Sequence, residues 1–243
     1  MILILGGTGE ARELAAALDA RGIPVTSSLA GRVARPRLPV GDVRVGGFGG
    51  PDALARWLAE HGVAAVVDAT HPFAERISAS AASACAAAGV SLLHLERPGW
   101  SERPGDRWTW VDDLAGAATA IRRLGTRMLL TTGRQGLSAF SVIDDAWFLI
   151  RCIDPPEPPL PPRHELILDR GPYTVAGELG LVDHHRIDVV VTKDSGGELT
   201  VAKLDAARER DLPVIVVRRP PRPAIETVAD VAAAAAWALG HAG

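Results

Sequence analysis

A glycine-rich turn near the N-terminus has the placement of a nucleotide-phosphate site. GGTGEAR, residues 6–12, directly follows the apolar run MILIL and opens an Ala-rich helical pattern. Backbone N–H groups at a helix N-terminus bind phosphate oxygens, and glycines let the backbone approach them closely. Gly6, Gly7, Thr8 and Gly9 are therefore candidate cofactor-binding residues. Two of the three glycines of a regular G-x-G-x-x-G motif are missing, so a turn that only packs helix on strand is the alternative.

The end of the second predicted strand bears on the choice of nucleotide. An NAD-specific site carries Asp or Glu there to hold the ribose hydroxyls, whereas this chain reads VTSSLAGR at residues 25–32. Ser28 and Arg32 offer a hydroxyl and a bidentate cation instead, and these suit a 2′-phosphate. The pattern favours NADP over NAD, and the alternative is that Arg32 is a solvated loop charge.

Polar residues also follow a third apolar strand. DATHPFA, residues 68–74, ends this strand, and open α/β sheets bind ligands at the carboxyl ends of their strands. Thr70 and His71 are thus candidate cofactor-binding residues, with His71 beside a nicotinamide rather than on a metal. Pro72 restricts the backbone next to His71. A histidine held for purely structural reasons is the alternative.

The second half of the chain repeats this placement of polar residues after strands. TTGRQ puts Arg134 at a strand end, and TKDSGG puts Lys193 and Ser195 at another, in a turn whose N–H groups suit an anion. Of 26 Lys plus Arg residues only two are Lys, and Lys193 and Lys203 lie in this one segment. A lysine is a compact point charge and does not copy the fork of arginine. Ser195 is a candidate cofactor-binding residue, and we expect it and Lys193 close to where cofactor and substrate meet; a helix N-cap by Asp194 or Ser195 is the alternative.

Tyr173 is the single tyrosine of the chain and stands just before a predicted helix. Its hydroxyl is a candidate proton donor, whereas packing at the start of the helix is the alternative. Because a free tyrosine has a pKa near 10, donation near neutral pH would need a lowered pKa.

The elements that must position these residues alternate along the chain. Apolar β-rich runs and Ala-rich helical patterns follow one another, which is typical of βαβ units and a parallel sheet. Predicted strands cover residues 2–5, 24–28, 43–45, 64–68, 91–95, 128–132, 147–153, 188–192 and 214–217. Predicted helices cover residues 10–21, 51–61, 73–88, 112–124, 173–182, 200–210 and 227–239.

These elements predict an α/β fold of two Rossmann-like domains with parallel sheets facing a cleft. The runs that begin at Met1 and Met128 both read as strand, small polar turn and helix, so the two halves of the chain have similar patterns. We expect domains over residues 1–97 and 98–243, with a linker at 97–108 and the alternative that the last helix packs back on the first domain. The proline-dense stretch 155–163 is expected to be an extended surface segment.

Composition excludes several other classes of protein. With 243 residues and a formal charge of −3, the chain lacks the basic balance of a nucleic-acid binder. Its apolar runs are shorter than the ~18 residues of a membrane helix, and the N-terminus lacks the basic start of a signal peptide. Cys85 and Cys152 have no metal-site spacing. We expect no metal, no membrane association and a cytoplasmic location.

Taken together, these motifs resemble one known family. GGTGEAR, SLAGR, DATHPFA, TTGR, TKDSGG and PVIVVRRP, spread over nearly the whole chain, are similar to the precorrin-6A reductase family of cobalamin biosynthesis. DATHPFA and TKDSGG are specific, whereas the glycine turn alone is not. The resemblance implies an NADPH-dependent reduction of one macrocycle double bond of precorrin-6A to give precorrin-6B.

The resemblance also implies roles for the candidate residues. The tetrapyrrole substrate carries many carboxylates, which suits Arg134, Lys193 and Lys203 as clamps, with Tyr173 on the same side. Hydride transfer rests mainly on positioning, so we assign His71 and Lys193 as positioning groups and expect no essential acid. Other enzymes of the pathway are conceivable partners. A non-catalytic NADP(H) sensor and a methyltransferase-like enzyme are the competing readings.

Overall fold

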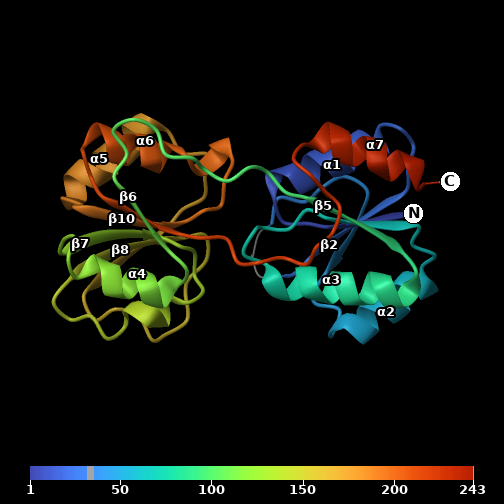
Figure 1. Cartoon of the computed structure of the whole chain (residues 1–243), viewed down its shortest axis with the longest axis horizontal. Coiled ribbons are helices and arrows are strands. Elements are labelled where there is room, and N and C mark those ends of the chain that lie inside the picture. Colours follow the sequence, from blue (N-terminus) through green and yellow to red (C-terminus); the bar gives the residue numbers. More distant parts are fainter. Residues whose placement is uncertain (32–35, 243) are drawn as a thin grey trace. The chain divides into compact units, whose positions relative to one another are not determined.

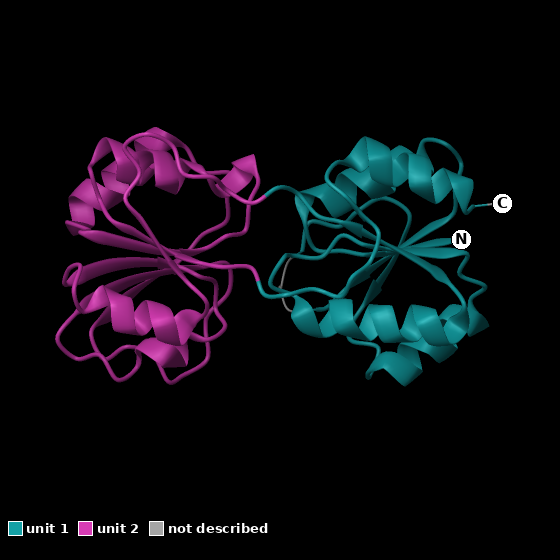
Figure 2. Cartoon of the chain, viewed as in Figure 1, with its two compact units in different colours: residues 1–98, 220–243 teal, residues 99–219 magenta. Residues whose placement is uncertain are grey.

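The computed structural model describes residues 1–31 and 36–242 of the chain, and these divide into two compact units. Unit 1 comprises Met1–Pro98 with Pro220–Gly243, and unit 2 comprises Gly99–Arg219 (Figure 2). The first crossing falls next to the predicted boundary at 97/98. The division 1–97 and 98–243 does not hold at the C-terminus, because the chain re-enters unit 1 at Pro220 and its last helix packs there.

Unit 1 is a parallel six-stranded sheet in the order β12-β5-β4-β1-β2-β3. Its strands are β1 (Ile2–Leu5), β2 (Val25–Leu29), β3 (Asp42–Val45), β4 (Ala65–Asp68), β5 (Ser91–Leu95) and β12 (Thr227–Val228). Its helices are α1 (Gly9–Asp19), α2 (Pro51–Glu60), α3 (Glu75–Ala88) and α7 (Val231–Gly240). Figure 1 shows α1 and α7 on one face of this sheet and α2 and α3 on the other.

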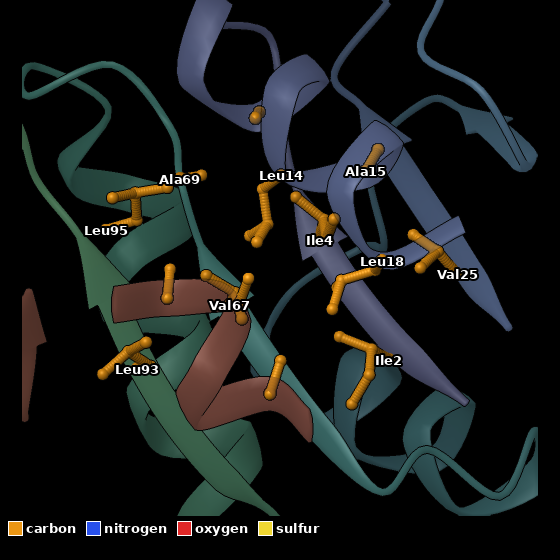
Figure 3. Close-up of a cluster of buried hydrophobic side chains, with 14 of the residues drawn as sticks. Ile2, Ile4, Leu14, Ala15, Leu18, Val25, Val67, Ala69, Leu93 and Leu95 are labelled. Atoms are coloured by element: carbon orange, nitrogen blue, oxygen red, sulfur yellow. The ribbon is translucent and has the colours of Figure 1, made fainter. Parts of the chain in front are cut away.

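The period-two alternation of β1 explains both layers of helices. Ile2 and Ile4 lie in an apolar cluster with Leu14 and Leu18 of α1 (Figure 3). The intervening residues of β1 lie in a second cluster with Leu54 of α2. A strand buried on both faces has no polar position to spare, which is why MILIL reads as a continuous apolar run.

Unit 2 is a parallel six-stranded sheet in the order β6-β11-β10-β7-β8-β9. Its strands are β6 (Trp108–Val111), β7 (Arg127–Thr131), β8 (Trp147–Cys152), β9 (His164–Leu168), β10 (Val189–Lys193) and β11 (Val214–Val217). Its helices are α4 (Leu114–Ile121), α5 (Val175–His185) and α6 (Ala202–Glu209), with 3-10 turns η1 (Leu137–Phe140) and η2 (Glu198–Thr200). In Figure 1, α5 and α6 cover one face and α4 the other.

Each unit is a parallel sheet with helices on both faces (Figure 1), which confirms the α/β class. The two units also share one strand order. In unit 1 the connections reverse direction between β1 and β4, and in unit 2 between β7 and β10. Ligands of open α/β sheets bind at such switch points, outside the carboxyl ends of the strands. The four segments that follow these strands are GGTG, DATH, TTGR and TKDSGG, so each unit places two of the predicted motifs at its switch point.

Four elements differ from the sequence expectations. β6, β9 and β12 are edge strands that the pattern did not predict, and β6 begins at the end of the expected linker. Where a helix was expected after β7, only the four-residue turn η1 forms. Gly133 and Gly136 have φ of 78° and 80°, a left-handed conformation that interrupts a helix. Within the described residues, no helix is long and apolar enough to span a bilayer.

Candidate functional site

The glycine turn of unit 1 is joined to the DATH segment across the switch point. The Thr8 hydroxyl donates to the Ala69 carbonyl at 2.8 Å and accepts from the Ala11 amide at 3.1 Å, so Thr8 is the N-cap of α1. Gly7 has φ of 114°, and a Cβ built on it meets nothing within 4 Å. The turn therefore leaves open space beside the backbone of a helix N-terminus, which fits a phosphate group.

A small cavity marks this switch point. It is lined by Thr8, Glu10, Ala69, Thr70, Pro72, Leu95, Glu96 and Arg97. Arg97 Nη1 lies 2.7 Å from Glu10 Oε2. Although burial raises the pKa of Glu10, its own amide and Arg97 outweigh this and lower it. The acidic group nearest the glycine turn is thus already paired with a cation.

A buried carboxylate organises the DATH segment. Asp68, at the end of β4, accepts from the Thr70 hydroxyl and the Ser78 hydroxyl, each at 2.6 Å, and from the Thr70 amide at 3.1 Å. His94 Nε2, on the paired strand β5, lies 3.0 Å from Asp68 Oδ2, the oxygen that also accepts from Ser78. Despite burial, which raises the pKa of Asp68, the bonds from His94, Ser78 and Thr70 lower it overall. Asp68 therefore fixes the start of the segment that carries Thr70 and His71.

This network predicts a large stability effect of Asp68→Asn. We expect a loss of about 2–3 kcal/mol in the free energy of unfolding by urea, since several bonds to a buried charge are weakened. Because the pKa of Asp68 is lowered in the folded chain, the contribution exists above the unfolded value near 3.9 and disappears as pH falls through the folded value. Asp113→Asn, at the exposed N-cap of α4, is the control. Equal small losses for both variants would contradict the network.

His71 is held by its neighbours at the edge of unit 1. Its Nδ1 accepts from the Phe73 amide at 3.3 Å, and its carbonyl accepts from Arg222 Nη2 at 3.0 Å. Since Nδ1 is an acceptor, a neutral His71 carries its proton on Nε2. Arg222 belongs to the segment that returns to unit 1, so the chain's C-terminal part contributes to this loop.

The structure adds an arginine beside Ser28. Arg44 of β3 is the register partner of Ser28, and its Nη1 donates to the Ser28 hydroxyl at 2.9 Å and to the Gly46 carbonyl at 2.9 Å. Its guanidinium lies 3.7 Å from the ring centroid of Phe48. The predicted partner Arg32 lies outside the described residues.

A second small cavity lies on this β1–β2 side of the glycine turn. It is lined by Gly6, Gly7, Ala11, Arg12, Ser27, Leu29, Arg37 and Pro39. The buried Ser27 hydroxyl has no hydrogen-bond partner among the residues that the structure describes. Two guanidinium groups and an unsatisfied hydroxyl form a donor set that suits an anionic sugar phosphate.

The switch point of unit 2 brings two other predicted groups to one edge. Thr131 of β7 is the register partner of Thr192 of β10, so Arg134 follows β7 and Lys193 ends the neighbouring strand β10. Burial lowers the pKa of Lys193. The Ser195 amide donates to the Lys193 carbonyl at 2.7 Å, and two glycines with positive φ follow. The arrangement is a cationic, glycine-rich strand end.

Lys203 lies elsewhere, in the interior of unit 2. It is 3% exposed, and its Nζ donates to the Thr200 carbonyl at 2.6 Å and lies 4.5 Å from the ring centroid of Trp100. Burial, reinforced by Arg151 and opposed by Glu178, lowers the pKa of Lys203 to about 7. A side chain enclosed in this way does not present its ammonium group to a ligand, contrary to the clamp expected from the sequence.

Tyr173 is likewise engaged with protein groups. Its hydroxyl donates to the Asp169 carbonyl at 3.2 Å, and the Arg151 guanidinium lies 3.9 Å from the centroid of its ring. Arg151 in turn forms a buried ion pair of 2.7 Å with Glu178. Burial raises the pKa of Tyr173 although the charge of Arg151 opposes it. A raised pKa is the reverse of what proton donation near neutral pH requires.

Sequence reasoning missed the supporting groups of both sites. Asp68 carried a visible signal, an acid that ends an otherwise apolar strand. The sequence around Arg44 carries no such signal, because the role of Arg44 depends on the register of β3 against β2. No group of three or more metal-ligating side chains occurs in the part of the chain that the structure describes.

Fold and sites together define a Rossmann-type enzyme scaffold, with an open glycine turn and a helix N-terminus at the switch point of unit 1. The family model described as precorrin-6x reductase CbiJ/CobK matches residues 1–238, and the chain belongs to this family of oxidoreductases. A precorrin-6A reductase of Rhodococcus erythropolis is 59% identical over 238 residues, covering 97% of this chain and 96% of the relative.

Two further comparisons, with a more distant relative and with a solved structure, agree with this family. A cobalt-precorrin-6A reductase of Priestia megaterium is 32% identical over 236 residues, covering 90% of this chain and 91% of that protein. The solved structure of CobK precorrin-6A reductase matches with a TM-score of 0.93 at 43% identity, covering 99% of this chain and 96% of that chain. Membership of a reductase family implies a nicotinamide cofactor.

Proposed function

We propose that this enzyme reduces one double bond of the precorrin-6A macrocycle with NADPH to give precorrin-6B. The observation that carries the proposal is the 59% identity over 97% of the chain to a protein named precorrin-6A reductase. Support for a cobalt-free substrate comes from the lower identity, 32%, to a relative named for the cobalt-containing one. The open backbone at Gly7 supports a dinucleotide at unit 1.

The residues of unit 1 would bind and orient the cofactor. Gly6 to Gly9 and the N-terminus of α1 would hold the pyrophosphate, while Ser28 and Arg32 would hold the 2′-phosphate, with Arg44 supporting Ser28. Thr70 and His71 would lie beside the nicotinamide, in a loop that Asp68 and Arg222 fix. The bound cofactor supplies a hydride. The protein's contribution is to hold the donor carbon about 3–3.5 Å from its acceptor.

In unit 2, Arg134, Lys193 and Ser195 would bind carboxylates of the tetrapyrrole. The cations are fixed at neighbouring strand ends, so they orient the macrocycle without taking part in bond making. A conjugated macrocycle spreads charge over its nitrogens, and the engaged hydroxyl and raised pKa of Tyr173 speak against a protein acid. Other enzymes of the pathway are proposed as transient partners.

The experiment that tests this function follows NADPH oxidation optically with and without precorrin-6A. We expect oxidation only when precorrin-6A is present, with one NADPH consumed per macrocycle. NADPH that binds but is never oxidised would support the non-catalytic sensor instead. Oxidation equally fast with the cobalt-containing macrocycle would remove the proposed preference for the cobalt-free substrate.

Cofactor choice gives a second test. NADPH should bind at least tenfold more tightly than NADH, or ~1.4 kcal/mol, by calorimetric titration. Arg32→Ala should erase most of this ratio, and Arg44→Ala should reduce it because the Ser28 hydroxyl loses its donor. Arg21→Ala, an exposed position at the far end of α1, is the control. Equal dissociation constants in the unmodified enzyme would defeat the assignment.

Tyr173→Phe should cost less than tenfold in single-turnover hydride transfer, or ~1.4 kcal/mol in the barrier. The hydroxyl that is removed bonds to the Asp169 carbonyl, and the ring that packs against Arg151 is retained. Stopped-flow measurement at saturating NADPH gives the rate. A loss of ~10³ or more with unchanged NADPH affinity would establish Tyr173 as the acid.

A further inference from the structure

The two connecting segments between the units are both attached to one carboxylate of unit 2. The chain leaves unit 1 before Gly99 and returns to it after Arg219. The Trp100 amide donates to Asp194 Oδ1 at 2.9 Å, and Arg219 Nε lies 3.2 Å from Asp194 Oδ2. Arg219 Nε also donates to the Asp194 carbonyl at 3.0 Å. Asp194 is 7% exposed, so its charge is satisfied by protein groups rather than by solvent.

Further contacts hold the loop that follows β10. The Asp194 amide donates to the Val217 carbonyl at 2.9 Å, which ties it to the adjacent strand β11. Trp100 Nε1 donates to the Gly197 carbonyl at 3.1 Å. Gly99 packs so closely that a Cβ there would lie 2.5 Å from Asp194 Oδ2. Both ends of the Lys193–Gly197 loop are therefore held by the connecting segments.

Asp194 does not serve as the N-cap of a helix, which would be its simplest structural role. The turn η2 that follows has no side-chain cap, and the N-cap residue of α6 is Val201, again without a side-chain hydrogen bond. Asp194 does not cap a helix. Its neighbours in sequence, Lys193 and Ser195, are two of the three groups of unit 2 assigned above to ligand binding, and Asp194 joins them in the backbone.

We propose that Asp194 is a positioning residue of the reductase reaction, which holds Lys193 and Ser195 in place by binding Trp100 and Arg219. The inference rests on the proposed function of Lys193 and Ser195. A charge-assisted contact on each side of the loop restricts it in two directions. Loss of either contact would let the loop shift, and a displacement of about 1 Å costs on the order of 100-fold where catalysis depends on orientation.

Two variants disturb Asp194 in different ways. Asp194→Asn keeps the shape of the side chain and removes its charge, whereas Gly99→Ala keeps Asp194 and forces its carboxylate aside. Each has a matched control in unit 2. Asp106→Asn removes the charge of a buried carboxylate paired with Arg208 at 2.9 Å, and Gly180→Ala adds a Cβ that meets nothing within 4 Å.

The readouts are kcat and KM for precorrin-6A, the Kd for NADPH, and the midpoint of thermal unfolding. We expect Asp194→Asn and Gly99→Ala each to lower kcat/KM for precorrin-6A at least tenfold, with the Kd for NADPH changed less than twofold. Asp106→Asn and Gly180→Ala should keep wild-type kinetics. If Asp194→Asn lowers only the unfolding midpoint, as Asp106→Asn is expected to do, Asp194 is structural and the inference is overturned.

A double-variant cycle separates this inference from the proposed function. If Asp194 acts through Lys193, Asp194→Asn should cause less than a twofold further loss in the Lys193→Met background. Full activity of Lys193→Met would contradict the proposed function of Lys193 itself. Impaired Lys193→Met beside unimpaired Asp194→Asn would overturn the positioning role alone.

Discussion

Gly7→Ala is expected to weaken NADPH binding about 100-fold, or ~2.7 kcal/mol. Gly7 has φ of 114°, where an L side chain is strained, and its Cβ would project into the open space beside the N-terminus of α1. That space is where the phosphates would meet backbone N–H groups, each worth about 1.5–3 kcal/mol when the acceptor is charged. Isothermal titration with NADPH measures the effect.

The matched control for this prediction is Gly22→Ala. Gly22 also has a positive φ, 72°, and a Cβ there meets nothing within 4 Å, but it lies beyond the opposite end of α1. Both variants should lose similar thermal stability, whereas only Gly7→Ala should lose affinity. Wild-type NADPH affinity in a folded Gly7→Ala variant would place the cofactor elsewhere in the chain.

The second large effect is expected at Lys193. Lys193→Met should lower kcat/KM for precorrin-6A about 100-fold, since a charge-assisted contact to a carboxylate is lost. Lys193→Arg should also impair turnover although the charge is kept, because the planar guanidinium is longer and differently aimed than a point charge. Steady-state kinetics with the Kd for NADPH as the reference separate substrate from cofactor effects.

If Lys193→Arg leaves turnover unchanged, Lys193 does not act as a positioned charge in the site. Unchanged kcat and KM in both variants would remove it from the site, and the grouping of Lys193 with Lys203 would then be coincidental. The buried position of Lys203 already separates the two lysines, since one lies at a strand end and the other inside unit 2.

The strands that carry the motifs were predictable from sequence because each is buried on both faces. β1 coincides with the predicted range 2–5, and the bounds of β4, β7 and β10 lie within one residue of the predicted ranges 64–68, 128–132 and 188–192. β6, β9 and β12 escaped prediction because they are edge strands with partly exposed residues, whose pattern is weak. The return of the last helix to unit 1 depends on packing against α1, which no local pattern encodes.

The candidate site was predictable to the extent that it consists of segments after strands. Thr8, Thr70, Lys193 and Ser195 lie at strand ends because parallel strands share one carboxyl edge. Their supports were not predictable, since Arg44 reaches Ser28 through strand register and Asp194 meets Trp100 and Arg219 across large separations in sequence. Lys203 was misjudged because residue type alone does not reveal burial.

The proposed reduction is a direct hydride transfer from NADPH to the macrocycle of precorrin-6A. The decisive measurement is a single turnover with NADPH that carries deuterium at both hydrogens of the reactive nicotinamide carbon, followed by mass spectrometry of the tetrapyrrole. We expect a product that has gained two hydrogens relative to precorrin-6A, one of them deuterium. A reduced product that contains no deuterium, or recovery of unchanged precorrin-6A and NADPH, would contradict it.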